Sequence, residues 1–259
     1  MVELIGKISR GTRMDQIYIP KERLPGFDAG TFVLIKPVLE KEKANPFYYN
    51  VPNLEPIKTV IIGEILDYFK HFENVVITGS FLEKGFDFED IDVILMADKK
   101  IGESNAERHF KSSLGINVHI TALDHRTLLK GLKTDPLFQM MLSRFVSKKR
   151  VIFKFKNEVN YKLLDLHLLK SKALIGNFDF LVGKEKYKMA RNLFAIKIFM
   201  ENKKISAESI NNDINGYFGK NAVENIKENL LDKGFIDKYK KLYNETFKKI
   251  MAGIKDGSK

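Results

Sequence analysis

The chain contains no cysteine and no tryptophan. Without thiols it can form neither a disulfide nor a zinc–thiolate site, and it has no cysteine nucleophile. No apolar run approaches the roughly 20 residues that a membrane-spanning helix needs, and the first residues show no signal-peptide pattern. We therefore expect a cytoplasmic protein with no membrane partner. Its 259 residues, 44% of them hydrophobic, are enough for two or three small domains with cores of their own.

The positive charge is distributed unevenly along the chain. The formal net charge is +11, and residues 148–259 carry 25 Lys and Arg against 13 Asp and Glu. Residues 51–147, in contrast, carry 11 basic and 14 acidic side chains. This asymmetry is typical of a protein that binds a polyanion, such as nucleic acid or a triphosphate and its acceptor. A set of solvated, Lys-rich helix faces is an equally good interpretation.

Two acidic residues lie at the start of an apolar run. Asp90-Ile91-Asp92 leads directly into Val93 to Ala97, which has the composition of a buried strand. Residues two apart on a strand face the same side, so Asp90 and Asp92 should stand roughly 6.5 Å apart along it. Two such carboxylates are costly to hold together unless a cation binds between them. Their oxygen ligands suit Mg²⁺, or Mn²⁺ in its place.

A glycine–serine turn precedes these acids. Gly79-Ser80 ends the apolar run Val75 to Thr78, which also reads as a strand. Glycine permits close backbone approach, and the turn offers free N–H groups and a hydroxyl. These are the groups that bind a phosphate.

The two features together resemble a known superfamily. A strand, Gly-Ser, about ten residues and then Asp-x-Asp within a second strand is similar to the signature of the DNA polymerase beta-like nucleotidyltransferases. The resemblance covers roughly residues 54 to 154, and Lys84-Gly85 matches a basic–Gly pair common in the small members. It implies transfer of a nucleoside monophosphate from an NTP, with ATP the expected donor, to a protein, RNA or small-molecule acceptor.

The resemblance also assigns roles to individual residues. It implies that Asp90 and Asp92 bind the metal and that these two acids and Ser80 are catalytic. Nucleotide binding would involve Gly79, Ser80, Lys84 and Asn117.

Asn117 departs from the pattern of that family. Ile116, Val118 and Ile120 alternate with polar residues, which predicts a half-buried strand. The family usually has a third carboxylate on this strand, and the equivalent position here is Asn117, followed by His119 on the same face. An asparagine can lend an oxygen to a metal but supplies no charge and no base. The alternative that this protein binds a nucleotide with weak or no turnover therefore stays open.

The N-terminal residues resemble a different family. Ile19-Pro20-Lys21, a basic connection, a glycine and the run Phe32 to Ile35 are similar to half of an AbrB-type swapped hairpin. That resemblance implies a homodimer that contacts DNA through Arg13, Lys21 and Arg23. A DNA-binding regulator is thus a second alternative. A β-appendage that packs on the next domain explains the same residues.

The remaining segments complete the expected architecture. We expect a linker over 41–53, helices over 54–70 and 123–145, a last strand over 150–155, and helices from residue 161 onward. The fold class is then α+β, a mixed-sheet nucleotidyltransferase core with an N-terminal β-appendage and a C-terminal helical bundle. The expected domains are 1–45, 54–155 and 156–259.

In the helical region, we expect neither Arg191 nor His167 to be catalytic. The region resembles partner domains that include the HEPN class, whose ribonuclease signature has a histidine four to six residues after an arginine. Arg191 has no such histidine, so we expect no ribonuclease activity. His167 lies among leucines and is expected to be a helix histidine with a hydrogen-bonding partner. The absence of tryptophan and of a single-strand stacking motif gives no particular support for RNA as the acceptor.

Overall fold

The computed structural model describes residues 45–97 and 104–256, together with residues 8–12, 14–18, 22, 25–28 and 30–31. The chain divides into two compact units, residues 1–43 and 44–259. In the first unit, β1 (Ile8–Ser9) pairs antiparallel with β2 (Gln16–Ile17). The expected DNA contacts Arg13, Lys21 and Arg23 lie outside the described residues.

The second unit is an α+β structure built on one five-stranded mixed sheet. Its strands, in spatial order, are β3 (Phe47–Tyr49), β7 (Phe145–Ser147), β4 (Asn74–Thr78), β5 (Asp90–Met96) and β6 (Asn117–Leu123). Only the β5–β6 pair is parallel, and the other three pairs are antiparallel. Strands β4, β5 and β6 agree with the three strands predicted from hydrophobic runs and alternation.

Two short strands correct the prediction from sequence. β3 lies inside the expected linker over 41–53, and β7 begins at the last residue of the helix expected over 123–145. The strand expected over 150–155 is wrong, because this segment runs outside the sheet and Ile152 is 69% exposed. Residues 145–147 take its place because Phe145 pairs with both Tyr49 and Thr78, which completes the sheet.

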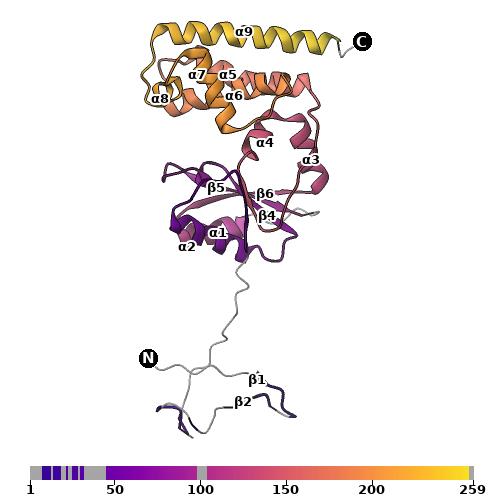
Figure 1. Cartoon of the computed structure of the whole chain (residues 1–259), viewed down its shortest axis with the longest axis vertical. Coiled ribbons are helices and arrows are strands. Elements are labelled where there is room, and N and C mark those ends of the chain that lie inside the picture. The colour runs from indigo at the N-terminus through magenta and orange to yellow at the C-terminus, as the bar shows by residue number, and fades with distance from the viewer. Residues whose placement is uncertain are drawn as a thin grey trace. The chain divides into compact units, whose positions relative to one another are not determined.

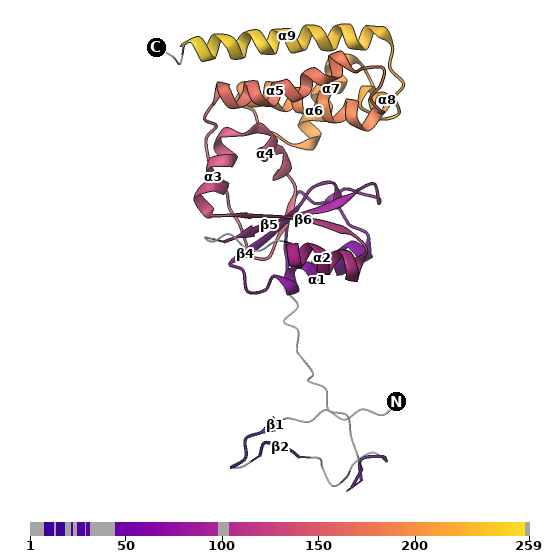
Figure 2. The ribbon, with the colours of Figure 1, turned by 180° about the vertical axis from the view of Figure 1, so that it is seen from behind.

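Helices cover both faces of the sheet. In the described residues they are α1 (Pro56–Tyr68), α2 (Ser104–Leu114), α3 (His125–Thr134) and α4 (Pro136–Met141), with a 3₁₀ turn, η1 (Ser80–Leu82). Helices α1 and α2 bury one face, and α3 and α4 pack on the other, on the side toward the C-terminal helices (Figures 1 and 2). Side chains of β5 therefore alternate between two cores.

The break between α3 and α4 has a local cause. The Asp135 side chain accepts hydrogen bonds from the N–H groups of Leu137 and Phe138, at 2.8 and 3.1 Å, and Pro136 occupies the first turn of α4. A capping aspartate followed by proline ends one helix and starts the next. The sequence predicted this interruption near Thr134–Pro136.

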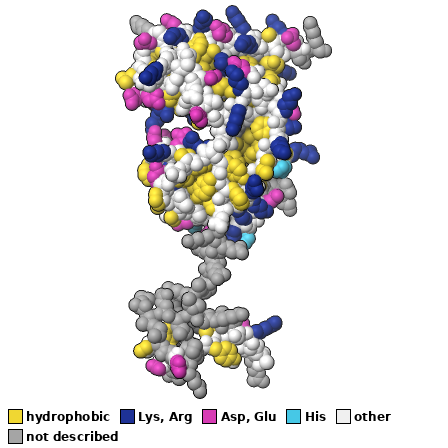
Figure 3. All heavy atoms as spheres, in the orientation of Figure 1, with side chains coloured by type: hydrophobic (Ala, Val, Ile, Leu, Met, Phe, Trp, Pro, Cys, Tyr) yellow, Lys and Arg dark blue, Asp and Glu magenta, His cyan; other side chains and the backbone are white. Residues whose placement is uncertain are grey.

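Basic and acidic side chains are interleaved on the visible surface of the C-terminal helices. Figure 3 shows Lys and Arg spread over this face, with Asp and Glu between them. The surplus of positive charge is not gathered at one point of the face that this view displays.

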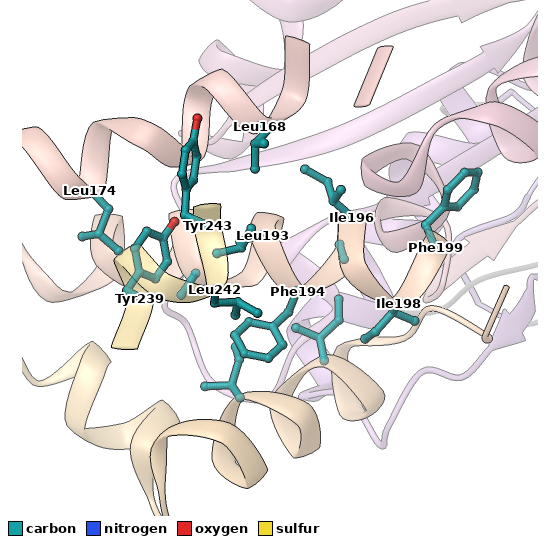
Figure 4. Close-up of a cluster of buried hydrophobic side chains, with 14 of the residues drawn as sticks. Leu168, Leu174, Leu193, Phe194, Ile196, Ile198, Phe199, Tyr239, Leu242 and Tyr243 are labelled. Carbon is teal, nitrogen blue, oxygen red and sulfur yellow. The ribbon is translucent and has the colours of Figure 1, made fainter. Parts of the chain in front are cut away.

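The C-terminal helices have a core of their own. They are α5 (Tyr161–Gly176), α6 (Gly183–Met200), α7 (Ala207–Phe218), α8 (Ala222–Lys227) and α9 (Lys233–Asp256). Leu168 of α5, Leu193 and Phe194 of α6, and Leu242 of α9 pack together in it (Figure 4). Helix α6 is central, since its neighbours α5, α7, α8 and α9 all contact it. No helix of the described residues is both long enough and apolar enough to span a membrane.

Candidate functional site

Asp90 and Asp92 are the first and third residues of β5. Ile91 between them is fully buried against α1 and α2, so both carboxylates lie on the opposite face of the sheet. This placement agrees with the strand geometry expected from the sequence. The pair occupies the end of that face nearest the turn that follows β4, because Thr78, the last residue of β4, lies opposite Asp92.

Gly79 brings the turn into contact with the second acid. Its backbone has φ +91°, a region that favours glycine, and a Cβ built there would lie 2.4 Å from Oδ2 of Asp92. Any side chain at this position would displace the carboxylate. Ser80, which is exposed, follows at the start of η1. The absence of a side chain at Gly79 therefore allows the turn after β4 to lie directly against the Asp92 carboxylate.

The neighbouring strand presents an amide and an imidazole. Asn117 lies opposite Asp90 in the parallel β5–β6 pair, and His119 lies opposite Asp92. His119 Nδ1 is 3.6 Å from Asp92 Oδ1. The described residues contain no cluster of three or more His, Asp or Glu side chains with metal-binding geometry. Two carboxylates and an amide thus face the same side of the sheet on neighbouring strands.

Glu107 of α2 is a nearby acid that the sequence did not indicate. It lines a shallow pocket of about 200 Å³ together with Asp90, Asn117, Val118 and His119. The helix carries Glu107 from the far side of the sheet to the edge strand β6. Only the packing of α2 on that strand reveals its proximity.

The pKa of Asp92 is raised. Burial is the main cause, and the negative charge of Asp90 is the next; His119 and Lys188 act in the opposite direction. Asp92 ionises less readily than an ordinary aspartate because it is partly buried and, to a lesser degree, because its neighbour is also acidic. A bound divalent cation would remove this repulsion, and carboxylate and amide oxygens are ligands that suit Mg²⁺. The residues present therefore fit a divalent metal.

Helix α6 of the C-terminal bundle supplies the positive charge near the acids. Lys188 lies close enough for its charge to favour ionised Asp92, and Lys184 forms an ion pair with Asp87 in the loop before β5. The start of α6 packs tightly on α8, because a Cβ on Gly183 would lie 2.1 Å from the carbonyl oxygen of Lys227. Packing thus fixes the helix end that carries both lysines.

An ion pair between a buried lysine and a partly exposed glutamate holds the loop between the turn and the acids. Lys58 of α1 is fully buried, and its Nζ donates hydrogen bonds to the carbonyl oxygens of Glu83 and Gly85, both at 2.5 Å. Its Nζ also lies 3.2 Å from Glu55, whose other carboxylate oxygen accepts the Gly85 N–H at 2.6 Å. Lys84, one of the expected nucleotide-binding residues, is exposed between Glu83 and Gly85.

His167 lies beside an acidic residue. Its Nε2 lies 3.1 Å from Oδ2 of Asp135, the residue that caps α4, and the imidazole is almost fully buried. The pair joins α5 to the α3–α4 junction, which is a structural connection remote from β5.

Comparisons with protein families, curated proteins and solved structures give no match to this chain. The interpretation of the site therefore depends on its geometry alone.

Proposed function

We propose that this protein is a Mg²⁺- or Mn²⁺-dependent nucleotidyltransferase of the DNA polymerase beta type, which moves a nucleoside monophosphate from an NTP to an acceptor. The observation that carries the proposal is the contact between Gly79 and Asp92. A glycine-led turn with an exposed serine lies directly against a carboxylate pair at the head of a strand. Phosphate-binding groups and metal-binding groups are then adjacent, which transfer from a metal-bound triphosphate requires.

The chain's own residues have distinct roles in this proposal. Asp90 and Asp92 hold the metal, which supplies Lewis-acid stabilisation of negative charge when it is bound. Gly79 and Ser80 bind phosphate oxygens through the backbone and the hydroxyl. Lys188 adds positive charge close to Asp92, where a triphosphate or an anionic acceptor would need it.

Asn117 supports a second candidate, a nucleotide-binding protein that turns over slowly or not at all. It lies opposite Asp90, where the resembled family has its third carboxylate. An amide at this position cannot serve as a base. Binding without transfer would then be the activity of the same site.

Transfer from labelled nucleotides distinguishes the two candidates. The protein is incubated with each α-³²P NTP and Mg²⁺, with the protein itself, total RNA and a cell lysate as acceptors. We expect metal-dependent label transfer that Asp92→Asn abolishes and that the exposed-acid control Asp179→Asn leaves unchanged. Nucleotide binding without transfer supports the second candidate, and absence of both refutes the site.

A further inference from the structure

A second, larger pocket lies on the same face of the sheet as the acids. It has a volume of about 530 Å³, within the range of small-molecule sites, and Tyr49 and Phe145 form part of its wall. Cross-strand pairing places Tyr49, Phe145, Thr78 and Asp92 in one row, so Phe145 lies two strands, or roughly 10 Å, from Asp92.

The turn between α4 and β7 separates this pocket from the acids. Thr78, which lies between Phe145 and Asp92 in the row, donates its hydroxyl to carbonyl oxygens of that turn, at 3.0 Å for Arg144. The Arg144 side chain forms an ion pair with Glu83, which lies in the loop between Gly79 and Asp90; Nη1 is 3.5 Å from Oε1. The pocket shares no residue with the shallow one beside Asp90. It is therefore a separate site.

Aromatic rings form one wall of the pocket. The rings of Tyr49 and Phe145 are stacked, with centroids 4.3 Å apart, and Phe153 packs against Phe145 at 5.9 Å. Phe155 also lines the pocket and is 37% exposed. A flat ring can stack on such a surface, and covering it removes apolar area from water.

Three lysines line the pocket, and no carboxylate does. Lys203 forms an ion pair with Glu201, with its Nζ 2.7 Å from Oε2. The ion pairs found among the described residues do not include Lys156 or Lys204, so these two charges are available to an anion. Two lysines outside these ion pairs favour a phosphate-bearing ligand.

Side-chain amides supply the remaining polar groups. Gln139 donates to the carbonyl of Leu132 at 2.6 Å and to Oδ1 of Asn157 at 2.7 Å, which fixes both amides. Asn157 uses only its oxygen in this bond, so its NH₂ group can still donate. The Asn50 amide is held by a 2.8 Å hydrogen bond to the Ser143 carbonyl and keeps its oxygen as an acceptor. Donors and acceptors of this kind match the edge of a heterocyclic base.

We propose that this pocket is a second binding site for a nucleoside monophosphate, distinct from the metal site. The base stacks on the aromatic wall and contacts the amides, and the phosphate contacts Lys156 and Lys204. The proposal does not depend on the activity of Asp90 and Asp92.

Calorimetry with AMP in the presence of EDTA tests the proposal. We expect AMP to bind the wild type and the Asp90→Asn/Asp92→Asn variant equally, and adenosine or inorganic phosphate to bind at least about tenfold more weakly. Phe155→Ala should weaken AMP binding at least about fivefold, the loss expected of one stacking contact. Lys156→Gln with Lys204→Gln should also weaken it, whereas the exposed control Lys172→Gln should not. The proposal is overturned if inorganic phosphate binds as tightly as AMP, or if the Phe155→Ala variant binds AMP with the affinity of the wild type.

Because the chain has no cysteine, one introduced thiol reports on the pocket independently. Ser143 lines the pocket and donates its hydroxyl to the Met140 carbonyl, and Ser112 makes the same kind of bond on the surface of α2. AMP should slow labelling of the Ser143→Cys variant by a thiol reagent and leave that of the Ser112→Cys variant unchanged. Equal rates with and without saturating AMP would place the nucleotide elsewhere and refute the assignment.

Discussion

The buried lysine on α1 gives the sharpest prediction. Lys58→Met keeps most of the side-chain stem but removes the charge that bonds the carbonyl oxygens of Glu83 and Gly85 and faces the Glu55 carboxylate. We expect a substantial loss of stability and a loosened loop between Gly79 and Asp90, because the fully buried Lys58 is the donor that both carbonyl oxygens lose.

The magnitude follows from the number of groups left without a partner. Two carbonyl groups each lose a charge-assisted hydrogen bond, at about 1.5 kcal/mol or more apiece. Loss of the contacts with the rings of Phe81, Phe86 and Phe88, 5.4 to 5.6 Å from Nζ, adds to this. A destabilisation of about 3 kcal/mol would lower the melting temperature by roughly 6–12 °C in a unit of this size.

The acid sensitivity of Glu55 should change in the same variant. Its pKa is lowered from 4.5 to about 2, chiefly by the hydrogen bond from the Gly85 N–H, with Lys58 contributing. A carboxyl group with a lowered pKa stabilises the fold above its unfolded pKa, and this contribution is lost as the pH falls from about 4.5 toward 2. Lys58→Met should raise the pKa of Glu55 toward its ordinary value, so that this contribution becomes smaller and is fully lost at a higher pH than in the wild type.

Thermal and urea denaturation between pH 3 and pH 7 measure both effects. Lys70→Met is the matched control, since Lys70 is exposed just beyond the end of α1, and it should change stability by less than about 0.5 kcal/mol. If Lys58→Met unfolds at the same midpoint as Lys70→Met, the buried charge does not hold the loop and this reasoning is refuted.

Three further predictions concern the acids and their turn. Gly79→Ala should destabilise the protein by about 1–3 kcal/mol, through strain and contact with Asp92, and should abolish the melting-temperature rise produced by Mg²⁺ with NTP; an unchanged rise contradicts the contact. Asp90→Asn should lower the pKa of Asp92 in an NMR titration, because the charge of Asp90 raises it, and should stabilise the metal-free protein by less than about 1 kcal/mol at this partly exposed pair. Asn117→Asp should destabilise the metal-free protein through repulsion from Asp90, with a smaller penalty and faster pyrophosphate release in Mg²⁺; brisk turnover unchanged by the substitution would show that the third position lies elsewhere.

Local patterns in the sequence determined the elements that carry the site. The apolar run before Gly79 and the alternation around Asp90 and Asn117 specified β4, β5 and β6, because side chains of a strand between two environments must alternate or be apolar throughout. The helix break at Asp135-Pro136 was equally readable, since capping and the missing proline N–H act within a few residues.

Only the tertiary structure decided which distant residues complete the sheet and surround the acids. β3 and β7 have three residues each, too few to show a period, and they are strands because each finds partners about 100 or 70 residues away. Lys58 reads as a polar position of an ordinary helix, and Lys188 as one lysine among many. Their burial and their charge contacts arise from chain segments that sequence spacing does not bring together, because the energies that place them come from packing over long separations.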